Sequence, residues 1–256
     1  MFCFPILISF LALSAPLPGS PPSVERWSEL ITVVQQANDV YGEGFEAGHA
    51  PDWALNEVLL DEAAGLAEGL GSEGSAIFPE FTMFKSAILN RGSVEWVSRA
   101  SDQLVQALVR AGHVTTSPRQ LPDLAHGAQV FASACAACHG VRGDTQAPAA
   151  RNMSPPPASF LDPEVMDNLT PYRLFNLVTH GLSQTAMPSF IALTEADRWA
   201  VSFYVIALRQ PPCVSPVRKL THEELATKSD AELRAAYGNP ALACLRRGNE
   251  RELNSP

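Results

Sequence analysis

Basic residues are scarce in this chain. Lysine and arginine together number 18 among 256 residues, against 27 aspartates and glutamates, so the formal net charge is −9. A field of that sign repels nucleic acid and attracts cations or basic partners. The excess of acid lies early, because residues 24–121 hold 6 basic and 14 acidic groups whereas residues 122–209 hold 5 and 7. We therefore expect no nucleic-acid binding and an acidic surface on the first half.

Long apolar runs are also lacking after the first residues. Residues 6–13 are largely apolar and residues 14–23 are small or proline, as in a secretory signal peptide. No Lys or Arg precedes the apolar core, so an uncleaved tether to the inner membrane is the alternative. Elsewhere nothing approaches the roughly 18 consecutive apolar residues of a membrane span. The sequence predicts a signal peptide over 1–23 and a soluble periplasmic protein.

No segment alternates apolar and polar residues as a strand does, whereas three- and four-residue apolar spacings recur. The expected fold class is all-α. An acidic helical bundle over 24–114 has helices over 24–39, 52–70, 79–90 and 93–111, with Asp52 and Ser93 as caps. A linker with two prolines follows, then a second domain over 122–209 and a helical tail over 210–256. Capping boxes at Thr221 and Ser229 predict two short tail helices.

Catalytic motifs are absent as well: no Ser/His/Asp set and no phosphate-binding glycine loop stands out. We therefore expect no substrate-transforming enzyme. Cysteine is rare, with five residues in all. Cys3 falls in the predicted signal peptide, and for Cys213 and Cys244 a disulfide and two free thiols are equally open.

The remaining two cysteines form the string Cys135-Ala136-Ala137-Cys138-His139. This C-x-x-C-H pattern is typical of c-type haem attachment, because two thiols one helical turn apart can add to the vinyl groups while the imidazole binds iron. A zinc site would need a fourth ligand, and His126 and His180 lack the usual paired spacing. A thioredoxin-like site would need a βαβ context. We therefore predict one covalent haem c held by Cys135, Cys138 and His139.

Met187, in a loop before Pro188, is the predicted sixth iron ligand. His/Met ligation is that of electron-transferring cytochromes. Met153, Met166 and His180 are the weaker alternatives, and we expect His180 to be a partly exposed residue at a helix end. The haem edge is expected to be lined by Pro155, Pro156, Pro157 and Phe160. The supporting helix crossing is expected to comprise Gly127, Phe131, Trp199 and Tyr204.

From Gly127 to Arg209 the chain resembles a monohaem class I cytochrome c. Three strings point to one group of proteins that contain such a cytochrome. The strings are Ser154-Pro-Pro-Pro-Ala-Ser-Phe160, Thr185-Ala-Met-Pro-Ser-Phe190 and Asp197-Arg-Trp-Ala-Val-Ser-Phe-Tyr-Val205. They are similar to bacterial fusion proteins in which a helical periplasmic segment and a cytochrome c precede a high-affinity iron permease. Residues 225–233 resemble the linker into that permease. Asp39-Val40-Tyr41, Glu57 and Asp61-Glu62 resemble the family's acidic positions, although its aromatic and Met spacers are missing after Glu57.

The permease helices are not in this chain, so we expect the permease to be a separate polypeptide or this chain to work alone. One interpretation is an exported electron carrier that takes electrons from ferrous iron for uptake, with the acidic bundle binding iron or docking a membrane iron permease. The alternative is a partner-docking cytochrome that passes electrons between redox donor and acceptor proteins unrelated to iron. For the acidic residues themselves, a solvated helix face is the simpler interpretation. A carboxylate pair facing the bundle interior would favour the first function, and an exposed apolar face the second.

Overall fold

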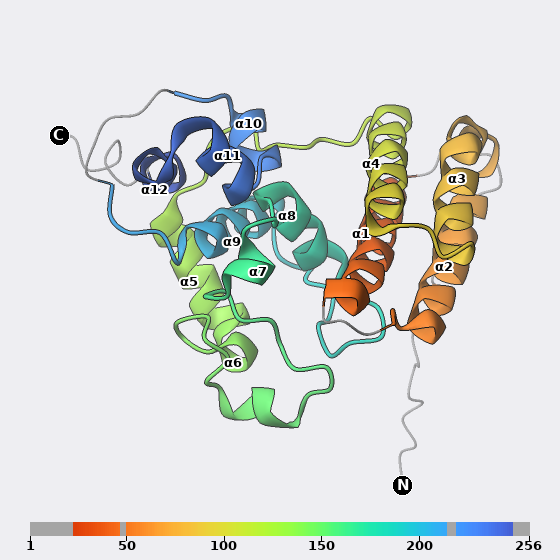
Figure 1. The fold of residues 1–256 in the computed structure, drawn as a ribbon. Coiled ribbons are helices and arrows are strands. Elements are labelled where there is room, and N and C mark those ends of the chain that lie inside the picture. The colour runs from red at the N-terminus through yellow and green to blue at the C-terminus, as the bar shows by residue number, and fades with distance from the viewer. Residues whose placement is uncertain (1–22, 47–49, 214–218, 248–256) are drawn as a thin grey trace, which may run out of the picture.

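The computed structural model describes residues 23–46, 50–213 and 219–247, so nearly all of the predicted signal peptide, including Cys3, lies outside the described residues. Over these residues the chain forms α-helices and short 3-10 helices and no strand, which confirms the all-α expectation. Among them, no helix combines the length and the apolar character of a membrane span. Figure 1 shows α1–α4 as one lobe and the later helices as a second lobe beside it.

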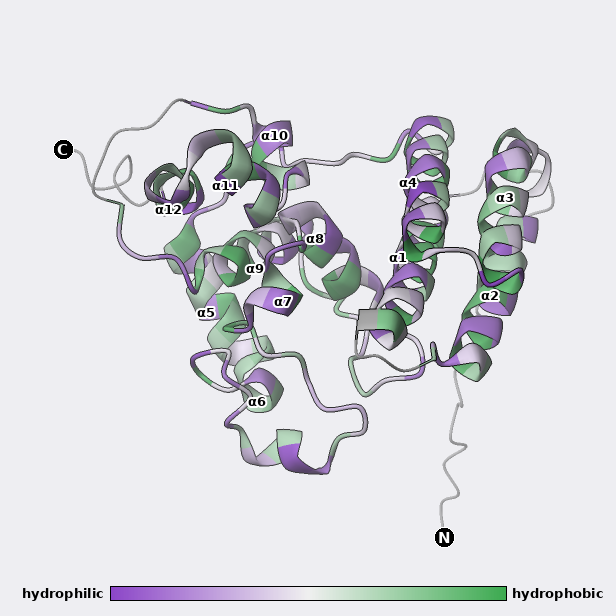
Figure 2. Ribbon diagram, viewed as in Figure 1, coloured by the Kyte–Doolittle hydropathy of each residue, from purple (hydrophilic) through white to green (hydrophobic). Residues whose placement is uncertain are grey.

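The first lobe is a bundle of four helices whose apolar stripes face one another (Figure 2). Val34, Phe84 and Leu104, from three of these helices, are fully buried. Asp52 accepts a hydrogen bond from the Leu55 amide and Ser93 accepts one from the Trp96 amide, so both predicted caps are confirmed. The elements are α1 (Val24–Glu46), α2 (Trp53–Glu68), the 3-10 helix η1 (Gly71–Ile77), α3 (Phe78–Leu89) and α4 (Val94–Ala111).

Helix α1 continues past Asp39, where the sequence predicted its end. Tyr41 is completely buried, and its hydroxyl donates to the carbonyl oxygen of Gly92 at 2.5 Å. Its ring also packs edge-on against Trp53, with ring centroids 5.7 Å apart. These tertiary contacts stabilise the last turns of α1 although Gly42 and Gly44 are poor helix formers.

The second lobe begins with α5, which crosses α9. A Cβ atom on Gly127 would lie 2.3 Å from the carbonyl oxygen of Ala200, so only glycine permits this approach. Thr170 and Thr194 cap α8 and α9 by accepting from the Arg173 and Asp197 amides. The elements are α5 (Leu124–Ala134), α6 (Ala136–His139), η2 (Pro148–Asn152), α7 (Pro163–Met166), α8 (Pro171–His180) and α9 (Glu195–Ala207).

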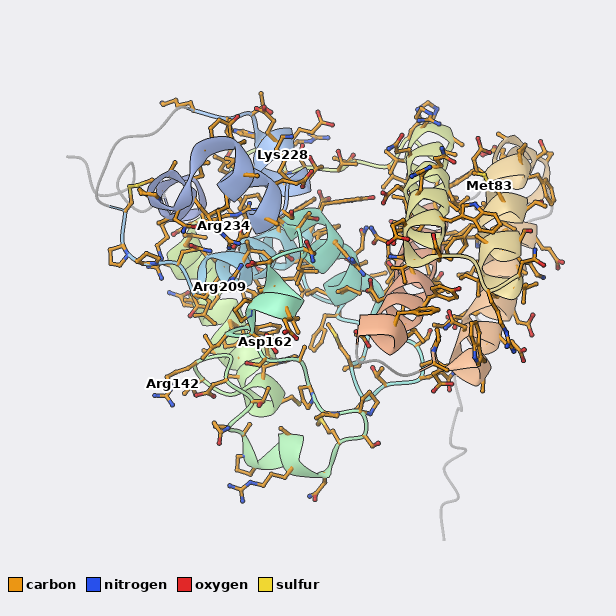
Figure 3. All side chains as sticks on the ribbon, in the orientation of Figure 1. Met83, Arg142, Asp162, Arg209, Lys228 and Arg234 are labelled. Atoms are coloured by element: carbon orange, nitrogen blue, oxygen red, sulfur yellow. A yellow bond between two sulfur atoms is a disulfide. The ribbon has the colours of Figure 1, made fainter. Side chains whose placement is uncertain are left out.

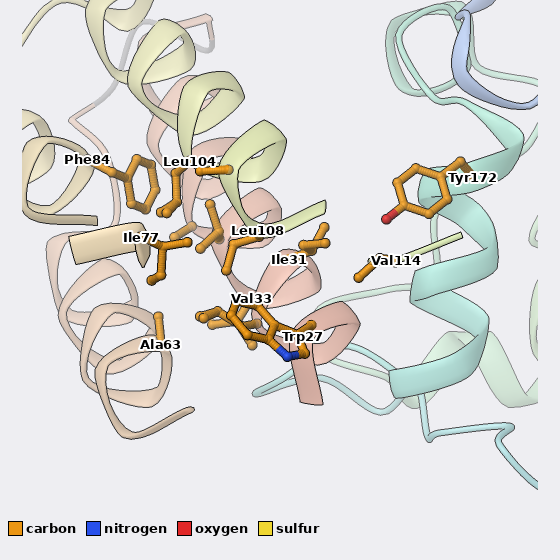
Figure 4. Packing of buried hydrophobic residues seen from close by; sticks show 14 of the residues in the cluster. Trp27, Ile31, Val33, Ala63, Ile77, Phe84, Leu104, Leu108, Val114 and Tyr172 are labelled. Carbon is orange, nitrogen blue, oxygen red and sulfur yellow. The ribbon is translucent and has the colours of Figure 1, made fainter. Parts of the chain in front are cut away.

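Helices α1 and α8 join the two lobes. Figure 4 shows Tyr172 and Val114 turned toward Ile31 and Trp27 of the bundle. One core cluster contains these residues together with Trp199 of α9, so no solvent layer separates the lobes. At the margin of this contact Asp39 forms an ion pair with Arg173.

The tail folds back on the second lobe as α10 (His222–Thr227), α11 (Asp230–Tyr237) and α12 (Asn239–Arg247). Both predicted capping boxes are present, whereas α12 was not predicted. Cys213 and Cys244 form a disulfide, so the free-thiol alternative is wrong.

Charged side chains attach the tail to the second lobe. Arg234 of α11 donates two hydrogen bonds to Asp167, and Arg209 contacts the same carboxylate from the end of α9. Figure 3 shows Arg209 and Arg234 side by side. Asp230, which is fully buried, accepts from the buried Arg246 at 2.7 Å. Residues 225–233 are therefore helix and turn packed on the second lobe.

Candidate haem site

The cysteine motif occupies one helical turn. Cys135 ends α5 and precedes α6, and its carbonyl oxygen accepts from the amides of Cys138 at 3.1 Å and His139 at 3.0 Å. Both thiols are free and partly buried. Burial, and secondarily the neighbouring Cys138, raise the pKa of the Cys135 thiol to about 11. The turn thus presents two free thiols one helical turn apart, with the imidazole at its end.

The ring of His139 is held by two neighbours. Its Nδ1 atom lies 3.1 Å from the carbonyl oxygen of Ala158. Because a carbonyl oxygen only accepts, Nδ1 carries the hydrogen and Nε2 keeps its lone pair. The ring stacks on Phe160, with centroids 4.4 Å apart and planes 18° apart. Burial lowers the pKa of His139, against the opposing effect of the Ala158 bond, so the neutral ligand form is favoured.

The Met187 loop is tightly folded. Gly181 has φ +78°, and a Cβ atom there would lie 2.7 Å from the carbonyl oxygen of Met187. The Leu182 amide donates to that same oxygen at 3.2 Å, and the Met187 amide donates to the Thr185 hydroxyl at 3.1 Å. This closed turn fixes the Met187 backbone at the end of α8.

Met187 and Cys135, far apart in the sequence, pack against one apolar cluster that includes Phe131 and Phe160. His139 borders the same cluster through its stacking on Phe160. The structure therefore brings three of the four predicted haem-binding residues to one cluster, and Cys138 lies in the same turn as His139.

The other candidate ligands lie in different settings. Met166 is fully buried inside the same apolar cluster against which Met187 packs. His126 lies 2.6 Å from Asp197. Met153 is partly buried after η2, with its amide bonded to the Ala150 carbonyl oxygen. His180 packs against the bundle, with Nε2 2.7 Å from the Ser28 hydroxyl.

As expected, His180 is a partly exposed residue at the end of α8, but its surroundings do not favour the charged ring. Burial, and then the charge of Arg198, lower the pKa of His180 to about 4, against the opposing charge of Glu25. Trp199 also differs from expectation: it stacks on Phe175, with centroids 4.1 Å apart, and belongs to the core shared with the bundle. Phe131 and Tyr204 do pack together beside the crossing, 5.5 Å apart.

These residues fit a covalently bound haem. The donor set is two thiols and one neutral imidazole whose second nitrogen is already bonded, which is how ligating histidines are usually oriented. Of the predicted edge, Phe160 is buried against His139, Pro157 is partly buried, and Pro155 and Pro156 are exposed.

The cytochrome c family model matches residues 124–209. This segment is a class I cytochrome c domain. The chain is accordingly a haem-based electron-transfer protein, and the cofactor of the family is covalently attached haem c. The bundle and the tail lie outside the matched residues. No significant match was found among curated proteins or among solved structures.

Sequence reasoning assigned no role to Gln36 and did not identify the partners of two acidic residues of the bundle. Asp39 is paired with Arg173, and Glu62 accepts a hydrogen bond from Ser183 at 2.6 Å. Their partners lie more than a hundred residues away, so no local pattern could indicate them. Within the described ranges, no three His, Cys, Asp or Glu side chains gather as a metal site would require.

Proposed function

We propose that this protein is an exported, periplasmic monohaem cytochrome that carries electrons between redox donor and acceptor proteins, with His139 and Met187 as axial ligands. The observation that carries the proposal is the single C-x-x-C-H turn packed against the cluster that also receives Met187. His/Met ligation occupies both faces of the iron, which suits one-electron transfer rather than oxygen chemistry.

Export is supported by the signal-like first 23 residues and by the disulfide of Cys213 and Cys244. Disulfides persist in oxidising compartments such as the bacterial periplasm. Thioether attachment of haem leaves Cys135 and Cys138 outside that disulfide.

Docking of partner proteins is supported by apolar side chains that stay exposed around the cytochrome motif. Val141 is 81% exposed, directly after the cysteine turn, and Ile191 is 53% exposed, just after the Met187 loop. Exposed apolar side chains near a redox group suit brief contacts with partner proteins. The same exposed character at Phe78 and Trp96 on the bundle supports a second partner contact there.

Oxidation of ferrous iron for uptake, with a membrane iron permease as partner, is the second candidate. Its support is the acidic bundle, since residues 24–121 hold 14 acidic and 6 basic groups and carboxylates suit hard cations. The nearest approach to a carboxylate pair is Glu29 with Glu62: burial, and next the charge of Glu62, raise the pKa of Glu29. Glu29 is exposed and Glu62 is bonded to Ser183, so this pair does not face the bundle interior. The geometry favours the partner-docking function.

Anaerobic titration of the oxidised full-length protein with ferrous iron separates the two. The visible band of reduced haem is followed in the wild type, in Glu29→Gln and in a control, Glu68→Gln, on an exposed site of the same lobe. Reduction that slows at least several-fold in Glu29→Gln alone would support iron oxidation. Equal rates in all three would leave the partner-docking function, and the lack of any covalent haem band would overturn both.

A further inference from the structure

The bundle holds the loop that carries Met187. Gln36 of α1 is 7% exposed, and its side-chain amide pairs with the backbone of Ser183. Its Nε2 donates to the Ser183 carbonyl oxygen at 2.8 Å, while its Oε1 accepts from the Ser183 amide at 3.2 Å. Glu62 of α2 completes the contact by accepting from the Ser183 hydroxyl at 2.6 Å. All three hydrogen-bonding groups of Ser183 are therefore satisfied by the bundle.

This contact continues directly to Met187. Leu182, next to Ser183, donates its amide to the Met187 carbonyl oxygen at 3.2 Å and accepts the Thr185 hydroxyl at 2.9 Å. The same Thr185 hydroxyl accepts from the Met187 amide at 3.1 Å. Because these bonds close the turn, a displacement of Ser183 displaces Met187. The other side of the loop is anchored by the cytochrome domain itself, where Ser189 donates to the Thr179 carbonyl oxygen.

The two hydrogen bonds between the Gln36 side-chain amide and the Ser183 backbone lie at the buried contact between the bundle and the Met187 loop, where breaking them is costly. A buried polar group that loses its partner costs more free energy than an exposed hydrogen bond contributes. Gln36 has no role in the bundle core, since both polar ends of its side chain are directed to Ser183. The pair therefore fixes the loop rather than the bundle.

We propose that Gln36 and Glu62 are positioning residues for the sixth haem ligand, so that the bundle sets the strength of the Met187–iron bond. The inference rests on the proposed role of Met187. It gives the bundle a function within electron transfer that needs no bound metal: loosening the contact weakens the methionine bond and lowers the reduction potential.

The test measures how easily imidazole replaces methionine in the ferric full-length protein, together with the methionine-to-iron charge-transfer band. Gln36→Ala removes two hydrogen bonds that hold the Met187 loop. Because Met187 then competes less well for the iron, the dissociation constant for imidazole should fall about tenfold. Ser183→Ala and Glu62→Ala each remove the hydroxyl–carboxylate bond, and the double variant should show no more than either single one. Glu62→Gln keeps an acceptor and should restore most of the wild-type affinity.

Two controls accompany these variants. Asp61→Ala removes the same charge from an exposed neighbour of Glu62, and Gln103→Ala truncates an exposed glutamine of α4. Both should keep the wild-type imidazole affinity. Wild-type affinity in Gln36→Ala, Ser183→Ala and Glu62→Ala, or an equal change in the controls, overturns the proposal.

Met187→Ala separates two possible failures: that Gln36 and Glu62 do not position Met187, and that Met187 is not the sixth ligand. If Met187→Ala removes the charge-transfer band and its imidazole affinity no longer responds to Gln36→Ala, the contact acts through Met187 as proposed. If Met187→Ala leaves the band intact, the sixth ligand is another residue and both proposals fall. If the band is lost while Gln36→Ala changes nothing, only the positioning role falls. Helical circular dichroism of each variant verifies that it is folded.

Discussion

Gly127 of α5 and Ala200 of α9 touch backbone to backbone, with room for no side chain between them: a Cβ atom on Gly127 would lie 2.3 Å from the Ala200 carbonyl oxygen and 2.7 Å from the Cβ atom of Tyr204. Tyr204 packs on Phe131, which belongs to the cluster beside the haem motif. The crossing thus determines where the cysteine turn at the end of α5 lies.

Gly127→Ala should destabilise the protein by about 1–3 kcal/mol, the usual cost of overpacking. Urea unfolding of the full-length protein measures it. Gly65→Ala is the matched control, because a Cβ atom there meets nothing within 4 Å. That change should stabilise by about 0.5–1 kcal/mol through helix propensity. Equal effects of the two changes would contradict the importance of the crossing.

Variants of the haem motif give the second prediction. Cys138→Ser should abolish double thioether attachment, and Met187→Ala should leave haem attached but lower the reduction potential, on the order of 0.1 V within the range that axial ligands cover. His180→Ala should do neither, because His180 lies against Ser28 of the bundle. Potentiometric titration with visible spectra measures each. An unchanged potential and spectrum in Met187→Ala would show that another residue is the ligand.

His180 gives a pH dependence. Its pKa of about 4 in the folded protein is below the ordinary value of 6.5, so the unfolded chain takes up a proton first as the pH falls. The free energy of unfolding should therefore decrease from about pH 6.5 down to about pH 4 and then level off. One proton gives at most about 1.4 kcal/mol per pH unit, and the partial exposure of the ring reduces this.

His180→Gln removes this titration while retaining a hydrogen-bonding group for Ser28. Urea unfolding at a series of pH values should show a flatter profile in His180→Gln than in the wild type over that interval. The difference between the two profiles gives the contribution of His180 to the pH dependence of the free energy of unfolding, because both proteins contain the same titrating carboxylates. Parallel profiles would contradict the assignment.

The tail is expected to depend on Asp230. This carboxylate is fully buried and accepts from Arg246, whose side chain is 1% exposed, and from Arg209 at 2.8 Å. Asp230→Ala leaves a buried guanidinium without its counter-charge and should destabilise by about 3–5 kcal/mol. Glu223→Ala, an exposed acid of α10, is the control and should have little effect. Hydrogen exchange of residues 219–247 locates the loss, and protection there equal to wild type would count against the prediction.

Sequence patterns correctly predicted the structural features that are formed by residues close together in the sequence. Three such features are the cysteine turn, the helix caps at Asp52 and Ser93, and the capping boxes of the tail. Each depends on residues within a few positions of one another. The all-α fold follows from the same short spacings.

The contacts between distant segments could not be predicted in this way. Asp39 belongs to a string chosen for its resemblance to a family's acidic positions, and nothing in that string indicates that its partner is Arg173 of the other lobe. Trp199 was assigned to the haem side because its helix was, whereas its ring lies in the core shared with the bundle. His180 lies at a helix end as expected, but its contact with Ser28 of α1, 152 residues away, has no local signal.

The core that α1 and α8 share has a kinetic consequence. Since Tyr172 and Trp199 are packed in one core with Trp27 and Ile31, any swing of the bundle relative to the cytochrome domain would have to separate buried apolar side chains. A protein that docked on the bundle would stand at a constant distance from the haem. Electron tunnelling from it would then proceed at one intramolecular rate, the same at every viscosity, rather than waiting on the swing of a tethered domain.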